Sequence, residues 1–255
     1  MTVAGIDVGA RNIKVVLLDD GDVIARGIEP AGMDTHAALE KVFAATLERG
    51  GVERQGLKRI VATGAGRKDV PFADGEVTEV SAVARAAAFL VPSCRTVIDV
   101  GAEEGRATRC DEHGKVVDFE VNEKCAAGAG TFTEAMARAL EVSLEELGKL
   151  SLKSENAVPM NAQCTVFAES EVVSLIHQRT PKADIARAVH DAIASRIISM
   201  VRKIGFEPDV MLVGGVANNP GFLDSMRRDL ETEITVPDAP EFVGALGAAL
   251  AAAES

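Results

Sequence analysis

The chain has 255 residues, of which 47% are hydrophobic, so it can bury a substantial core in one large domain or in two lobes. Its 39 acidic residues outnumber its 27 basic ones, and the net charge of −12 argues against long-range attraction to nucleic acid or to an anionic membrane. No uncharged apolar stretch reaches the roughly 18 residues of a membrane span. Because the first residues lead directly into a strand and not into a signal peptide, we expect a cytoplasmic protein.

The first third of the chain begins with short apolar segments that are joined by tight turns. We expect three strands, a helix, a strand and a helix, in that order, at residues 3–8, 13–18, 23–27, 35–49, 59–63 and 80–90. The two short connections between the first three strands are typical of an antiparallel meander. Gly50 and Gly51 are expected to end the first helix.

The opening pattern then returns. Three more strands are expected at residues 96–100, 106–110 and 115–121. The first strand of each set ends in the same tripeptide, Asp-Val-Gly, at Asp7 and at Asp99. We interpret this repeat as an internal duplication of a β-β-β-α lobe, with an N-terminal lobe at residues 1–92 and a C-terminal lobe at residues 93–255.

The remainder of the chain is predominantly helical. Apolar spacing predicts helices at residues 131–140, 144–150, 165–177, 183–204, 222–230 and 241–253, and strands at residues 210–213 and 234–236. In the helix at residues 183–204, isoleucine and valine recur along one stripe, which is typical of a helix with one buried face.

The two Asp-Val-Gly turns have the chemistry of a magnesium–nucleotide site. A carboxylate at a strand end can hold Mg²⁺, usually through water molecules. Glycine lets the backbone approach phosphate oxygens, and the N–H groups that follow form an anion-binding nest. Lys14 could neutralise a β-phosphate. A single turn of this kind is common as a plain turn, but two of them, with Gly214-Gly215 after a late aliphatic strand, favour a nucleotide site. No P-loop or Rossmann glycine pattern is present.

Two of the four cysteines, Cys125 and Cys164, stand directly before or near the start of a predicted helix. A thiolate there is stabilised by the helix dipole, and the free N–H groups can bind the sulfurs of an iron–sulfur cluster. Two ligands per chain would suit a [4Fe–4S] cluster that is shared across a two-fold axis. From spacing alone, buried thiols, a redox pair and metal ligands all remain open. Cys94 and Cys110 are expected to be buried thiols.

The histidines are not paired at the spacing of metal ligands. We expect them at the surface or at helix caps: His36, His113, His177 and His190.

Several segments together resemble the activator ATPases of 2-hydroxyacyl-CoA dehydratases, which are related to ATPase subunits of benzoyl-CoA reductases. The matching segments are Asp7-Val-Gly9, Ala62-Thr-Gly64, Asn122-Glu-Lys-Cys-Ala-Ala-Gly-Ala-Gly130, Cys164-Thr-Val-Phe-Ala-Glu-Ser-Glu171, Ile193-Ala-Ser-Arg196, Gly214-Gly-Val-Ala-Asn218 and Gly244-Ala-Leu-Gly-Ala-Ala249. The resemblance implies an α/β protein with a duplicated actin-, hexokinase- and Hsp70-like (ribonuclease H-like) fold, whose two lobes surround a nucleotide cleft.

The resemblance also implies a function. A second ATPase subunit, identical or paralogous, would share one [4Fe–4S] cluster with this chain through Cys125 and Cys164. Hydrolysis of ATP, bound with Mg²⁺, would drive one electron from reduced ferredoxin or flavodoxin to an acyl-CoA dehydratase or reductase.

The implied hydrolytic residues are Asp99 and Glu103. The implied nucleotide-binding residues are Asp7, Gly9, Ala10, Arg11, Asn12, Lys14, Gly101, Ala102, Gly128, Gly130, Gly214, Gly215, Val216 and Asn218.

This sequence departs from the family pattern at both turns. Ala10-Arg11 stands where many activators have a Ser-Thr pair, and the second turn reads Asp99-Val-Gly-Ala-Glu-Glu-Gly-Arg106 where Asp-Ile-Gly-Gly-Gln-Asp-X-Lys is common. Glu103 therefore occupies the place of a glutamine that would orient water. Because of these differences, a role as a subunit of an aromatic-ring reductase remains an alternative to a role as a dehydratase activator. A sugar-type kinase of the same fold and a non-catalytic ATP sensor are the alternative functions.

Overall fold

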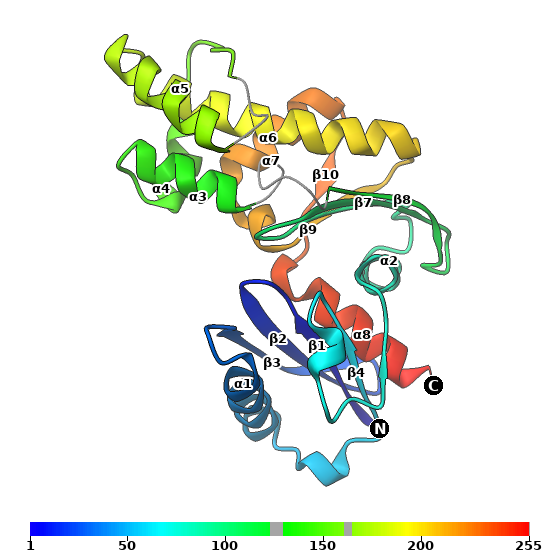
Figure 1. The fold of residues 1–255 in the computed structure, drawn as a ribbon. Coiled ribbons are helices and arrows are strands. Elements are labelled where there is room, and N and C mark those ends of the chain that lie inside the picture. Colours follow the sequence, from blue (N-terminus) through cyan, green and yellow to red (C-terminus); the bar gives the residue numbers. More distant parts are fainter. Residues whose placement is uncertain (123–129, 161–164, 255) are drawn as a thin grey trace. The chain divides into compact units, whose positions relative to one another are not determined.

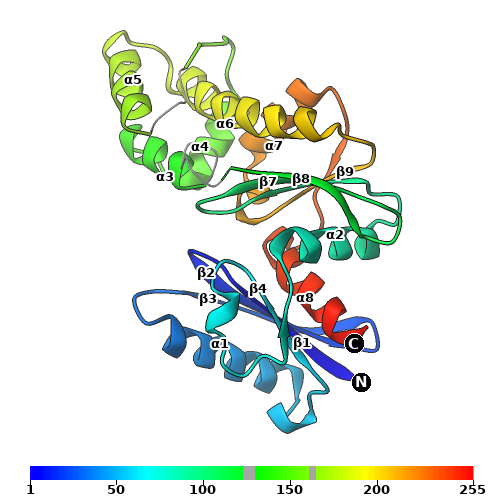
Figure 2. The same ribbon diagram turned by 45° about the vertical axis from the view of Figure 1, so that its right-hand side comes forward.

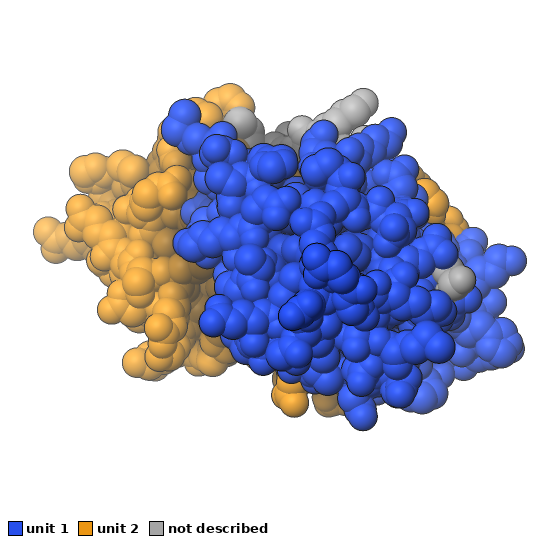
Figure 3. All heavy atoms as spheres, turned by 90° about the horizontal axis from the view of Figure 1, so that it is seen from below, with its two compact units in different colours: residues 1–95, 110–117, 241–255 blue, residues 96–109, 118–240 orange. Residues whose placement is uncertain are grey.

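The computed structural model describes residues 1–122, 130–160 and 165–254. By the contacts within the chain, it contains two compact units, which Figure 3 shows in different colours. Unit 1 consists of residues 1–95, 110–117 and 241–255, and unit 2 consists of residues 96–109 and 118–240. The lobe boundary at residues 92 and 93 stays a prediction. The compact units differ from it in two respects, since residues 110–117 and the last helix both count with the first part of the chain.

Unit 1 is built on a five-stranded sheet with the order β3-β2-β1-β4-β5 (Figure 1). Its strands are β1 (Thr2–Val8), β2 (Asn12–Asp19), β3 (Asp22–Pro30), β4 (Ile60–Thr63) and β5 (Gly75–Glu76). The first three strands form the predicted antiparallel meander, whereas β4 pairs in parallel with β1 and with β5. The sequence did not predict β5, because a strand of two residues carries no periodic signal.

Three helices complete unit 1: α1 (Thr35–Gly50), α2 (Glu79–Leu90) and α8 (Val243–Ala253). The side chain of Asp34 caps α1 by accepting from the N–H of Ala37 at 2.9 Å. The buried face of α1 includes Leu39, Val42 and Phe43, which belong to the core under the sheet. Figures 1 and 2 both show α8 beside β1 and α2.

Unit 2 repeats the same sheet. Its strands are β6 (Thr96–Val100), β7 (Gly105–Cys110), β8 (Val116–Asn122), β9 (Val210–Val213) and β10 (Ile234–Thr235). Their order, read as β8-β7-β6-β9-β10, matches β3-β2-β1-β4-β5 strand for strand. The directions match too, since β6 pairs antiparallel to β7 and parallel to β9. The predicted duplication is therefore confirmed by the topology of the two sheets.

The helices of unit 2 lie close to their predicted positions. They are α3 (Gly130–Ala139), α4 (Leu144–Ser151), α5 (Thr165–His177), α6 (Lys182–Ile204) and α7 (Pro220–Leu230). Ser143 and Glu146 form a capping box at the start of α4. The isoleucine and valine stripe of α6 is fully buried, as predicted. No helix of the described residues is long and apolar enough to cross a membrane.

Candidate functional site

The first Asp-Val-Gly turn joins β1 to β2 and carries an ion pair. Asp7 on β1 lies opposite Lys14 on β2 in the antiparallel register, which directs both side chains to the same face of the sheet. Lys14 Nζ donates to Asp7 Oδ2 at 2.9 Å, and each side chain is only 15% exposed. The N–H of Gly9 donates to the carbonyl of Asn12 at 3.1 Å. This bond closes the turn, at whose tip Ala10 and Arg11 are exposed.

The second Asp-Val-Gly turn has the same construction in unit 2. Asp99 on β6 lies opposite Arg106 on β7, and Arg106 Nη1 donates to Asp99 Oδ2 at 3.0 Å. The N–H of Gly101 donates to the carbonyl of Glu104 at 2.9 Å. Glu103 lies exposed at the tip of this turn. The duplication therefore extends from the sheets to the individual side chains.

Each aspartate is also packed against a glycine from the neighbouring parallel strand. Gly64 follows β4 with φ 92°, and a Cβ added there would lie 2.5 Å from Asp7 Oδ1. Gly214 follows β9 with φ 87°, and a Cβ there would lie 2.7 Å from Asp99 Oδ1. Both positions need glycine for the left-handed backbone and for the space. Each unit thus combines a carboxylate, a cation from the next strand and a closely packed glycine.

The second turn is connected to the start of α3. The N–H of Gly130 donates to the carbonyl of Gly101 at 2.9 Å, and the N–H of Thr131 donates to the carbonyl of Ala102 at 2.8 Å. Two N–H groups at a helix start that have no partner within the helix are satisfied in this way. The sequence predicted the helix and the turn, but no local pattern could reveal that they are hydrogen-bonded to each other.

The loop after β9 also lies next to the Asp99 turn in unit 2. Residues Gly215–Asn218 form a single 3-10 turn in which Gly215 and Asn218 are exposed. Val216 is close to Gly130, since a Cβ at Gly130 would lie 3.1 Å from Val216 Cγ2. The structure therefore brings Gly101, Ala102, Gly130, Gly214 and Val216 together around the Asp99 turn.

The cysteines divide into two pairs. Cys94 and Cys110 are buried, as predicted, and burial raises the pKa of the Cys110 thiol. Both are therefore unreactive thiols within the fold. Cys125, Cys164 and Gly128 lie outside the described residues. Among the residues that are described, no three or more His, Cys, Asp or Glu side chains form a group that could hold a metal ion.

The expectation for the histidines was wrong at one position. His36, His113 and His177 are exposed, but His190 is fully buried on α6. Its Nδ1 lies 2.8 Å from the carbonyl oxygen of Ala186, which can only accept a hydrogen bond. Burial lowers the pKa of His190 to about 4, so the ring is neutral at physiological pH. It supports the core and is not a candidate ligand.

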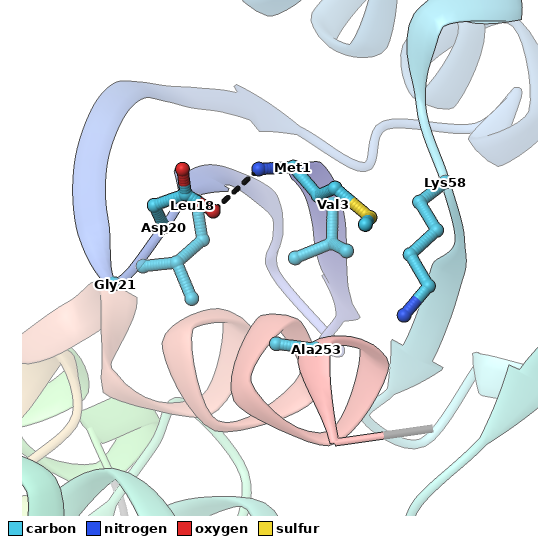
Figure 4. Close-up of a pocket in the computed structure, with 7 residues that line it drawn as sticks. All are labelled: Met1, Val3, Leu18, Asp20, Gly21, Lys58 and Ala253. Atoms are coloured by element: carbon cyan, nitrogen blue, oxygen red, sulfur yellow. Dashed lines mark hydrogen bonds and ion pairs between the residues drawn. The ribbon is translucent and has the colours of Figure 1, made fainter.

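A surface pocket of about 340 Å³ lies elsewhere in unit 1 (Figure 4). Met1 and Val3, at the beginning of β1, contribute to its lining, together with Leu18, Asp20, Gly21, Lys58 and Ala253. Asp7 is near the other end of β1. None of the predicted nucleotide-binding residues lines this pocket, which is therefore separate from the Asp-Val-Gly turns.

The sequence is similar to one family of ATPases along nearly its whole length. A model described as the BadF/BadG/BcrA/BcrD ATPase family matches residues 4–252. The chain is 40% identical over 254 residues to the 2-hydroxyisocaproyl-CoA dehydratase activator of Clostridioides difficile, covering 98% of this chain and 94% of the relative. It is 32% identical over 259 residues to one of the subunits of the benzoyl-CoA reductase of Thauera aromatica, covering 97% and 91%.

Solved structures agree with these relatives. The structure of (R)-2-hydroxyglutaryl-CoA dehydratase component A of Acidaminococcus fermentans matches with a TM-score of 0.96 and 35% identity, covering 100% of this chain and 98% of that one. A ROK family glucokinase of Streptomyces griseus matches with a TM-score of 0.61 and 12% identity over the whole of both chains, which shows a shared fold alone. The predicted actin- and hexokinase-like α/β fold is confirmed.

Proposed function

The chain belongs to the BadF/BadG/BcrA/BcrD ATPase family, and from this membership we propose that it is an iron–sulfur ATPase that drives low-potential electron transfer to an acyl-CoA-processing enzyme. Relatives are named as activators of 2-hydroxyacyl-CoA dehydratases and as a component of benzoyl-CoA reductase. The observation that supports the proposal is the hydrogen-bonded link between the Asp99 turn and α3, because it joins the turn that we propose to bind phosphate to the helix that follows Cys125 in the sequence.

The duplicated turns support the binding of a magnesium nucleotide. Asp7 and Asp99 would hold Mg²⁺ through water molecules, and the glycine-containing turns would bind phosphate through backbone N–H groups. Lys14 would add positive charge for a phosphate oxygen. In unit 2, Gly130, Gly214, Gly215, Val216 and Asn218 would line the nucleotide beside Gly101 and Ala102.

Hydrolysis itself requires an oriented water molecule. The water oxygen bonds to the γ-phosphorus while the bond to the bridging oxygen breaks, and ADP leaves with that electron pair. The proton released by the water ends on the phosphate product or in solvent. Asp99, with Glu103 at the exposed tip of the turn, would orient the water by accepting its hydrogen bonds.

The cluster would be held by Cys125 and Cys164 of each of two subunits. Thiolates are the usual ligands of a [4Fe–4S] cluster, which would supply a one-electron carrier. Cys164 directly precedes α5, so that helix N–H groups lie next to it in the chain. The surface of α5 also exposes apolar side chains: Val166, Phe167, Val173 and Ile176. Such a surface is suited to a contact with a second ATPase subunit or with the partner enzyme.

The partner would be a 2-hydroxyacyl-CoA dehydratase or a reductase of the benzoyl-CoA type, and reduced ferredoxin or flavodoxin in the cytoplasm would donate the electron. Nucleotide binding would act on the cluster through the Asp99 turn and the start of α3, in a motion of the two units relative to each other. The lobe boundary at residues 92 and 93 is part of this proposal.

Anaerobic purification of Cys125→Ser and Cys164→Ser tests the proposal. Each variant should lose its iron and its absorbance at about 400 nm, where thiolate-ligated clusters absorb. Its circular dichroism spectrum, which reports the fold, should stay unchanged. Cys94→Ser is the matched control, because Cys94 is buried within unit 1, and it should keep the iron. A Cys125 or Cys164 variant with full iron content would exclude that residue as a ligand. A colourless wild-type protein that phosphorylates sugars would overturn the function itself.

A further inference from the structure

The forked contact of Arg106 with Asp99 and Glu104 points to a residue role beyond those predicted from the sequence. We propose that Arg106 is a positioning residue that fixes the Asp99 carboxylate for ATP hydrolysis, and that Glu104 keeps Arg106 in place. This inference rests on the proposed ATPase function. It assigns different tasks to the two cations that occupy equivalent places in the two units.

The guanidinium of Arg106 contacts two carboxylates, one through each terminal nitrogen. Its Nη1 donates to Asp99 Oδ2 at 3.0 Å, and its Nη2 donates to the carboxylate of Glu104. The side chain of Arg106 is 12% exposed and that of Asp99 is 14% exposed, so solvent weakens the Asp99 contact less than it would at a free surface. The planar guanidinium can engage two carboxylates at once in fixed directions, which a lysine ammonium does not do as rigidly.

Lys14 occupies the equivalent place in unit 1 but is held differently. Among the described residues, Asp7 is the carboxylate that pairs with Lys14. Asn12 stands where Glu104 stands in unit 2, since the N–H of Gly9 bonds to Asn12 as that of Gly101 bonds to Glu104. The neutral Asn12 cannot hold the ammonium by charge. Lys14 is therefore the cation that can turn from its aspartate to a phosphate oxygen.

This division predicts different kinetic effects of the two cations. A group that orients the water-positioning carboxylate acts on the chemical step, so its loss lowers kcat with little change in KM. A group that binds phosphate in the ground state and in the transition state changes KM. We therefore expect the loss of Arg106 to lower kcat and the loss of Lys14 to raise KM.

The experiment compares steady-state ATP hydrolysis by the full-length protein and its variants. Arg106→Met should lower kcat by about 10- to 100-fold with KM nearly unchanged. Arg106→Lys restores a cation opposite Asp99 but not the planar fork, so it should recover only part of the loss. Glu104→Gln should lower kcat less than Arg106→Met does, because the guanidinium keeps its contact with Asp99 and loses only the charge of Glu104. Lys14→Met should raise KM by about tenfold or more, the effect of one charge-assisted hydrogen bond.

Arg109→Met is the matched control, because Arg109 lies on the same strand and its ion pair is with Glu207, at 3.1 Å. Its kcat and KM should stay at the wild-type values. If Arg106→Met does not fold, Arg106→Lys and Glu104→Gln carry the test, and unchanged kcat in both would overturn the inference. If the wild-type protein hydrolyses ATP and Arg106→Met has the same kcat, the role of Arg106 is overturned and the proposed ATPase function is not. A wild-type protein without ATP turnover would overturn the proposed function as well.

Discussion

At the scale of single residues, Gly214 and Gly64 combine a left-handed backbone with close packing, so neither position has room for a side chain. Both have positive φ, and a Cβ at either position would lie 2.4 Å from the carbonyl oxygen of the residue after the aspartate, Val100 or Val8. Alanine must therefore displace the strand end and the carboxylate beside it. This requirement explains why a glycine directly follows the parallel strand in each unit, at Gly64 after β4 and at Gly214 after β9.

We predict that Gly214→Ala and Gly64→Ala each lower the free energy of unfolding by about 1–3 kcal/mol, because of backbone strain and crowding. The Gly214 variant should also lower ATP turnover, since the added methyl group moves Asp99. Thermal melting and kcat measure the two effects. Gly56→Ala is the control, because a Cβ there makes only an ordinary contact of 3.8 Å with Val52. Equal melting temperatures for all three variants would contradict the prediction.

His190 gives the protein a pH dependence of stability. Burial lowers its pKa in the folded state to about 4, from 6.5. Between these values the unfolded chain binds the proton and the folded protein does not, so stability falls as the pH falls from 6.5 towards 4. We expect a slope on the order of 1.4 kcal/mol per pH unit from this group.

Urea unfolding midpoints of the wild-type protein and of His190→Gln, measured from about pH 7.5 to pH 5, provide the test. The glutamine variant should lose part of the dependence, even if its stability is lower throughout. His36→Gln should keep the wild-type slope, because His36 is exposed. Parallel pH curves for the wild-type protein and His190→Gln would show that His190 is not responsible.

At this scale, the sequence locates those features of the two turns whose signal is local. The two aspartates and their glycines follow from a tripeptide at a strand end, and Lys14 was singled out as a cation near the first turn. Arg106 and Glu104 received no role, because their contacts with Asp99 depend on the strand register. His190 was placed wrongly because its spacing to other histidines says nothing about which face of α6 is buried.

At the scale of elements, backbone hydrogen bonds join the start of α3 to the Asp99 turn. The N–H of Thr131 donates to Ala102 at 2.8 Å. Proline is tolerated in the first turn of a helix, where it removes an N–H that has no intrahelical partner. Thr131→Pro therefore deletes this bond and keeps the helix.

We predict that Thr131→Pro retains wild-type helix content but loses most of the ATP-dependent change in amide hydrogen exchange across α3. The physical reason is that one of the two backbone hydrogen bonds between the turn and the helix start is lost, which weakens their coupling. Thr131→Val is the control, because it removes the hydroxyl group and keeps the N–H. If Thr131→Pro responds to ATP as the wild-type protein does, this bond does not transmit the nucleotide state.

Elements with a clear period or turn signal were predicted close to their observed bounds. The exceptions have a physical reason. The strand β5 and the 3-10 turns are too short for any periodicity, and β3 continues to Pro30 because pairing with β2, and not its own sequence pattern, decides where it ends. The pairing of β4 with β1 is likewise a long-range contact.

At the scale of the whole molecule, duplication accounts for most of the architecture. Two sheets with the same strand order carry the same Asp–cation–Gly arrangement, and the recurrence of three expected strands around an Asp-Val-Gly turn predicted the duplication. The copies have diverged in charge, since Glu104 adds a second carboxylate in unit 2 where unit 1 has Asn12. This divergence is the basis for assigning different tasks to Arg106 and Lys14.

The position of α8 in unit 1 has a consequence for biosynthesis. Gly5 on β1 is so close to α8 that a Cβ there would lie 2.0 Å from the carbonyl oxygen of Ala245. Residues 241–255 emerge from the ribosome after residues 1–240, so unit 1 stays incomplete on the nascent chain while unit 2 already has its residues available. Unit 1, whose first residues are synthesised before those of unit 2, can therefore complete its fold only after unit 2 has all its residues. Until α8 is synthesised, part of the apolar surface of β1 stays uncovered.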